Sequence, residues 1–145
     1  MTSEVKTLDL ENKVDEESID TEFERFIEMN DIDLDTEGLD DNTRRDIEAD
    51  IRKVKRGIKD GRITIDDKGH ATVHPRVSKD QKPITFGYLT GNAWMESDRK
   101  KGHQDVQKQF AVMGACSRRS VAHFGALRQG DLKYCQAVFS LLADL

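Results

Sequence analysis

The stretch TRRDIEADIRKVKRGIKDG, residues 43–61, carries the clearest structural signal in the sequence. Its large apolar residues recur at intervals of three and four, which places them on one face of a helix. They are Ile47, Ile51, Val54 and Ile58. Thr43 and Asp46 approximate a capping box at its start, and Gly61 suits the left-handed conformation that ends a helix. The stretch therefore predicts an amphipathic helix with its apolar face on a core.

A small β-sheet is expected directly after this helix. Residues 63–65 and 71–73 alternate β-branched and small side chains on either side of the turn Asp66–Gly69, which predicts a hairpin. Residues 84–86, Ile-Thr-Phe, are expected to add a third strand. Because an isolated hairpin is marginally stable in water, we expect it to pack against the neighbouring helices.

The remainder of the chain is predicted to be helical. One helix is expected to begin at Thr90 or Asn92 and to end near Lys101-Gly102, and the next to run from about residue 106 to 116. Ser117 is a candidate cap for a shorter helix, and the turn at Gly130-Asp131 leads into the last one. The predicted fold class is α+β, mainly α: a small helical domain with a β-hairpin.

Charge is divided unevenly along the chain. Residues 1–50 hold 19 acidic and 5 basic residues, whereas residues 51–145 hold 9 acidic and 18 basic ones. We therefore expect an acidic N-terminal arm at 1–38 on an α-rich domain at 39–145. Residues 1–18 lack periodicity, which predicts disorder, and 19–29 form a short amphipathic helix. Such an arm contacts its own basic domain or a basic partner, and charge alone does not choose between them.

Six apolar residues are candidates for contact with a protein partner. Three lie in the acidic arm and three in the helical domain: Phe23, Phe26 and Ile27, and Trp94, Met95 and Met113. Methionine and aromatic side chains suit an adaptable partner surface. The alternative is that they are ordinary core residues.

Catalytic and metal-binding patterns are missing from the sequence. Asp31, Asp33 and Asp35 have the spacing of a calcium loop, but its sixth and twelfth positions hold Thr36 and Asn42 instead of Gly and Glu. The histidines lack the spacing of a zinc site, and there is no glycine-rich phosphate loop or nucleophile elbow. We expect a protein that is not an enzyme, with no metal and no cofactor.

Three clusters of basic residues could form a surface that binds nucleic acid. They lie at Arg52, Lys53, Lys55, Arg56 and Lys59, at Arg99, Lys100 and Lys101, and at Arg118 and Arg119. Aromatic residues do not interleave with them as a base-stacking platform requires, so solvated helix faces are favoured and nucleic acid is not expected.

Targeting signals are also missing. No apolar run is long enough to cross a bilayer, and the N-terminus MTSEVKTLDLENK has no signal-peptide pattern. We expect the chain to stay in the compartment where it is made, with Cys116 and Cys135 as reduced thiols.

The C-terminal half has a recognisable series of motifs. It runs through PITF (83–86), LTG (89–91), GACS (114–117), GD (130–131) and VF (138–139). Over roughly residues 83–142 this order resembles the tail assembly chaperones of tailed bacteriophages. Residues 1–60 depart from the pattern of that family.

The resemblance implies a non-enzymatic assembly chaperone or scaffold in the cytoplasm of a bacterial host. Its partner would be the tape measure protein, a long helical chain that stays soluble until tail-tube subunits assemble around it. The resemblance does not decide whether the chain also forms homo-oligomers. The alternatives are a nucleic-acid-binding or DNA-mimicking regulator, or a head–tail adaptor of the virion.

Overall fold

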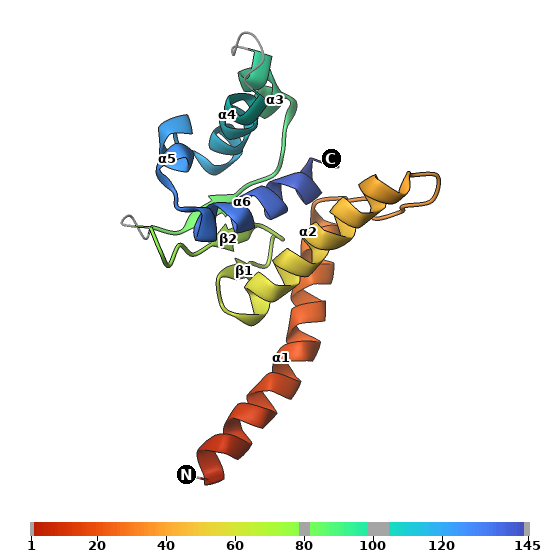
Figure 1. The fold of residues 1–145 in the computed structure, drawn as a ribbon, viewed down its shortest axis with the longest axis vertical. Helices are drawn as coiled ribbons and strands as arrows, with labels where there is room; N and C mark the ends of the chain where they lie inside the picture. The colour runs from red at the N-terminus through yellow and green to blue at the C-terminus, as the bar shows by residue number, and fades with distance from the viewer. Residues whose placement is uncertain (1, 79–81, 99–104, 144–145) are drawn as a thin grey trace.

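The structure is a computed structural model that describes residues 2–78, 82–98 and 105–143. In this part of the chain six helices surround a three-stranded sheet, which confirms the mainly helical α+β class (Figure 1). The elements are α1 (Thr2–Met29), α2 (Asp41–Lys59), β1 (Ile63–Ile65), β2 (Ala71–Val73), β3 (Ile84–Phe86), α3 (Gly91–Asp98), α4 (Asp105–Ser117), α5 (Val121–Ala126) and α6 (Gln129–Leu142). The expected helix end at Lys101-Gly102 and the cluster at 99–101 lie outside the described residues.

The sheet is antiparallel in the order β1-β2-β3, so the hairpin and the third strand are both confirmed. The outer residues of each three-residue strand are buried, and the central threonines face the other side. The hydroxyls of Thr72 and Thr85 form a hydrogen bond of 2.7 Å across that outer face. Gly69 closes the hairpin turn at φ 81°, a conformation that glycine adopts without strain.

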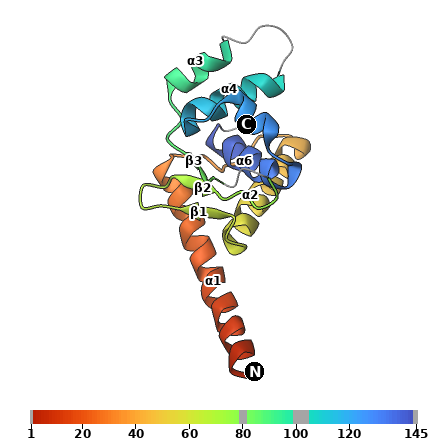
Figure 2. The same cartoon turned by 90° about the vertical axis from the view of Figure 1, so that its left-hand side faces the viewer.

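The helices lie mainly on the buried face of the sheet. Figure 2 shows α3, α4, α6 and the sheet one below another, with α1 extending past the sheet. α6 packs against α2 and β2, and α4 packs against β3. The fully buried side chains Phe86, Phe124 and Phe139 come from the sheet, α5 and α6, so one core joins these layers.

α1 is longer than the predicted helix and belongs in part to the core. It begins at Thr2, where the sequence predicts an irregular arm, and its N-terminal half projects beyond the other elements (Figure 1). Residues 1–29 contain neither proline nor glycine, so nothing in them breaks a helix. Ile19, Phe23 and Phe26 are buried in the common core, which continues to Ile32. The predicted boundary at 38/39 therefore divides a continuous core.

Two predicted helix caps are wrong by three residues each. Asp40, not Thr43, caps α2, because its carboxylate accepts a hydrogen bond of 2.7 Å from the Thr43 amide. Hydrogen bonding from the Thr43 side chain, and next from its amide, lowers the pKa of Asp40. Ser120, not Ser117, caps α5, while the Ser117 hydroxyl donates to the carbonyl of Met113 at the end of α4. The predicted left-handed end of α2 at Gly61, φ 75°, is confirmed.

Candidate protein-binding surface

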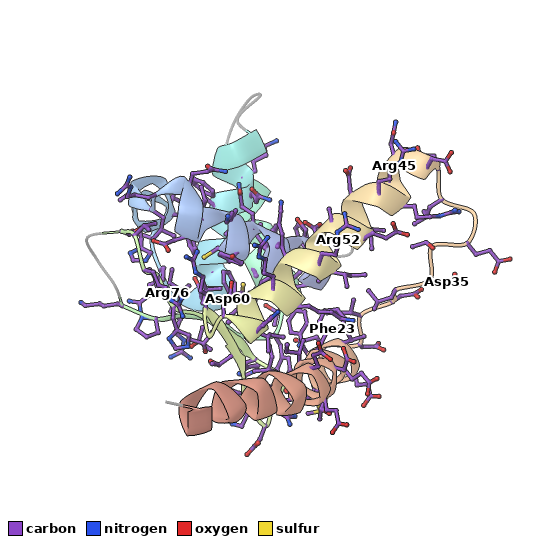
Figure 3. The ribbon with its side chains drawn as sticks, turned by 60° about the horizontal axis from the view of Figure 1, so that its bottom comes forward. Phe23, Asp35, Arg45, Arg52, Asp60 and Arg76 are labelled. Carbon is purple, nitrogen blue, oxygen red and sulfur yellow. The ribbon has the colours of Figure 1, made fainter. Side chains whose placement is uncertain are left out.

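Three of the predicted partner-binding residues are core residues. Phe26 and Met113 are fully buried and Phe23 is 5% exposed, so their side chains are inaccessible to a partner in this structure. Ile27 is partly buried against the same core. Phe23, Phe26 and Ile27 lie on α1, which packs on α2 and β1, as Figure 3 shows for Phe23 between α1 and α2. Met113 lies on α4, which packs on α3, α5 and β3. For these residues the alternative, a core role, is the correct one.

Trp94 and Met95, in contrast, are on the surface. Their side chains are 39% and 59% exposed, and both lie on the short helix α3. The Trp94 ring also contacts Phe139 of α6, with 6.2 Å between the ring centroids. One part of the indole is thus held by the core while the rest faces solvent, which is how tryptophan is used at many protein interfaces.

Trp94 borders a hollow of about 360 Å³ that the fold assembles from distant parts of the chain. Its apolar wall, called the Trp94 surface below, consists of Met29, Tyr88, Leu89, Trp94 and Leu142. The Met29 and Tyr88 side chains are 47% and 45% exposed. The sequence does not identify Met29 or Tyr88 as candidates, because Met29 ends α1, Tyr88 lies in the loop between β3 and α3, and only the tertiary fold brings them together.

The hairpin turn fixes the position of Tyr88. The Tyr88 hydroxyl donates a hydrogen bond of 2.8 Å to the carbonyl of Lys68, and its ring meets the His70 ring edge-on at 4.4 Å. The same turn holds the end of α1, because the Asn30 amide donates to the carbonyl of Gly69 at 2.8 Å. The hairpin turn therefore holds both the Tyr88 side and the Met29 side of the Trp94 surface.

Acidic residues line the hollow and its neighbour. Asp31 borders the first hollow, and Asp33 and Asp35 border a second one of about 240 Å³. The second hollow has apolar walls from the loop after α1, from α2 and from α6: Ile32, Leu34, Leu39, Ile47 and Leu141. Leu142 lines the first hollow and Leu141 the second, so both hollows lie near the C-terminal end of α6. Each hollow has apolar walls with at least one carboxylate in its lining.

The described residues show no arrangement suited to catalysis. Burial raises the pKa of the Cys116 thiol to about 11, and burial and the nearby Asp131 charge raise that of Cys135 to about 12. Both thiols are therefore protonated near neutral pH and are poor nucleophiles. Within residues 2–78, 82–98 and 105–143 no three His, Cys, Asp or Glu side chains gather as metal ligands. The absence of an activity and of a metal stays a prediction.

One buried carboxylate has a structural role. Asp131, in the first turn of α6, accepts hydrogen bonds from the backbone amides of residues 76–78 and from the Ser78 hydroxyl, at 2.6–3.1 Å for the closest contact of each donor. Burial by itself raises the pKa of Asp131, but these hydrogen bonds outweigh it and hold the pKa below its usual value. The carboxylate ties the loop after β2 to α6.

Comparison with protein-family models, with curated proteins and with solved structures found no match to this chain. The resemblance to tail assembly chaperones thus rests on the quoted motifs alone. In the part of the chain that the structure describes, no helix combines the length and the apolar character needed to cross a membrane.

Proposed function

We propose that this chain is a non-enzymatic assembly chaperone that holds an amphipathic, basic helical segment of a partner protein at the Trp94 surface. The observation that carries the proposal is the gathering of three half-exposed apolar side chains, Met29, Tyr88 and Trp94, around one hollow. Single exposed apolar residues are common on soluble proteins, but a cluster of them at a concave site is typical of a binding surface.

The composition of the surface fits a helical ligand of varied sequence. Methionine adapts its shape to different partners, and tyrosine and tryptophan supply large contact areas with little loss of entropy. A partner helix inserts its apolar residues at i, i+3, i+4 and i+7 into such a groove. The carboxylate of Asp31 in this hollow, with Asp33 and Asp35 in the neighbouring one, favours lysine or arginine beside those apolar residues.

The motifs at 83–142 indicate which partner to test. They resemble those of phage tail assembly chaperones, so the tape measure protein is the partner that we propose. Its long helices expose apolar faces before the tail tube forms, and a chaperone that covers those faces keeps the chain soluble. Trp94 and Met95 come three and four residues after the LTG motif, so the motif and the exposed surface belong to the same segment.

Co-expression with a tape measure protein, the partner that we propose, tests the proposal. Wild-type chain is expected to move most of that partner into the soluble fraction. The double variant Trp94→Ser, Met95→Ser is expected to return most of it to the pellet, because the variant lacks the two exposed apolar side chains of α3. The soluble fraction of the partner is measured by quantitative gel densitometry.

Val77→Ser is the matched control, because Val77 is 43% exposed and lies outside the Trp94 surface. Val77→Ser is expected to keep as much of the partner soluble as the wild-type chain does. A partner that stays equally insoluble with wild-type chain contradicts the chaperone function. Equal rescue by the double variant contradicts the assignment of the surface.

A further inference from the structure

A second surface of different chemistry lies between α1 and α2. There a groove of about 750 Å³ has one basic wall, formed by the C-terminal half of α2. Its cations are Arg52, Lys53, Lys55, Arg56 and Lys59, and Asp60 after the end of α2 is, among the described residues, the one acidic residue on this side. On the opposite wall α1 contributes Glu16 and Ile19. Glu16 and Met29, which belongs to the Trp94 surface, are about 20 Å apart along α1, so the two surfaces are separate.

The protein itself neutralises little of this basic wall. Lys55 forms an ion pair of 3.5 Å with Asp20 of α1, and its ammonium lies 5.0 Å from the centroid of the Phe23 ring. Across the described residues, the other four cations form no ion pair within 4 Å, although Lys53 interacts at longer range with Asp50 of the same helix. All four are exposed: Arg52, Lys53, Arg56 and Lys59. The acidic N-terminal half of the sequence thus meets this wall at a single ion pair within the described residues.

We infer that the groove between α1 and α2 binds an acidic helical segment of a partner protein. Arg52, Arg56 and Lys59 are spaced i, i+4 and i+7, so they lie on one face of α2 over about 10 Å. A helix with glutamate or aspartate at the same spacing presents its carboxylates with matching separation. The partly apolar floor, with Ile19 and Ala49, accepts a small apolar side chain between those carboxylates.

A protein helix fits this groove better than nucleic acid does. Glu16 and Asp20 of α1 stand opposite or beside the cations and would face the phosphates of a duplex, which is negatively charged on every side. A peptide helix concentrates its acidic residues on one face and can turn neutral or basic residues towards α1. The groove lining also contains no aromatic residue on which a base of a single strand could stack.

Fluorescence anisotropy with a labelled peptide tests this inference on the full chain. The probe is an alanine-based helix of about 20 residues, long enough to be helical in water, with glutamates at i, i+4 and i+7 along one face. Wild-type chain is expected to bind it with an affinity that falls as salt rises. The variant Arg52→Glu, Arg56→Glu is expected to bind about tenfold more weakly or worse, because two attractive charges become repulsive.

Arg44→Glu, Arg45→Glu is the matched control, since it makes the same change of charge on exposed residues of α2 outside the groove (Figure 3 shows Arg45 at the end of α2 away from the sheet). It should change the affinity by less than about twofold at physiological salt, where screening limits the range of charges. Arg52→Gln, Arg56→Gln repeats the test without introducing repulsion, and thermal unfolding confirms that each variant folds.

Three results would overturn the inference. If wild-type chain does not bind the peptide, the groove is not a site for an acidic helix. Equal weakening in both charge-reversal variants shows an effect of net charge alone. The third result is that wild-type chain binds single-stranded or duplex DNA more tightly than it binds the peptide of equal charge. If the Arg52→Glu, Arg56→Glu variant loses that DNA binding, the groove is a nucleic-acid site instead.

Discussion

Replacement of Asp131 by alanine is expected to lower the free energy of unfolding by about 3–4 kcal/mol, because it leaves four donors, two of them buried and two part-buried, without an acceptor. The donors are the amides of residues 76–78 and the Ser78 hydroxyl. Ser78 also accepts a hydrogen bond of 3.0 Å from the Arg128 amide at the start of α6, so the change reaches that junction too. Urea denaturation followed by circular dichroism measures the loss.

Ser78→Ala is the milder comparison, with an expected loss of about 1 kcal/mol, since it removes one hydroxyl and keeps the carboxylate. A loss below about 1 kcal/mol for Asp131→Ala would mean that water satisfies the amides of residues 76–78 equally well. In that case the carboxylate would not be what fixes the loop after β2 to α6.

The contribution of Asp131 also depends on pH. Its folded-state pKa lies below the usual aspartate value of about 4, so the ionised carboxylate stabilises the fold at neutral pH. This stabilisation is present in full above the unfolded-state pKa and is lost as the pH falls through the lower folded-state pKa. The stability difference between wild type and Asp131→Asn is therefore expected to be constant from pH 5 to 7 and to narrow below about pH 4. A difference that does not change with acid contradicts a charge-based role.

Phe26→Ala is expected to cost about 3–5 kcal/mol, because it opens a cavity in the core that α1 shares with the sheet. Phe26 is fully buried, and its ring centroid lies 6.4 Å from that of Phe23. For a chain of this length the corresponding fall in melting temperature is about 10 °C, which calorimetry resolves easily. The large value follows from α1 being part of the domain.

Met29→Ala is the control for Phe26→Ala, since Met29 is on the same helix but 47% exposed. It is expected to cost less than about 1 kcal/mol. If Phe26→Ala were equally mild, α1 would be an arm that does not contribute to the core, as the predicted boundary at 38/39 implies.

Local signals predicted most of the elements after residue 40. The stripe of isoleucine and valine at 47–58 predicted α2, and alternation around Asp66–Gly69 predicted the hairpin. Helix starts were less predictable, because Asp40 and Thr43 are both good caps and only the backbone geometry selects Asp40. The first half of α1 has no apolar period, so the sequence predicts no helix there.

The candidate surface was predictable only in part. Periodicity shows that Phe23 and Phe26 share a face with Ile19, but it does not show whether that face meets the chain's own core or a partner. Trp94 and Met95 were identified because they are large apolar residues on a short helix. Met29 and Tyr88 are 59 positions apart in the sequence, and their meeting at the Trp94 surface depends on tertiary packing.

Trp94 fluorescence tests the central claim most directly, because Trp94 is the one tryptophan in the sequence and lies on the proposed binding surface. A helical segment without tryptophan, taken from the proposed partner, is titrated into the full chain while emission and iodide quenching are recorded. We expect the emission to shift to shorter wavelength and the quenching to fall as the segment covers the indole. Binding of the segment, shown by calorimetry, with unchanged emission and quenching would contradict the claim that the Trp94 surface is where the partner binds.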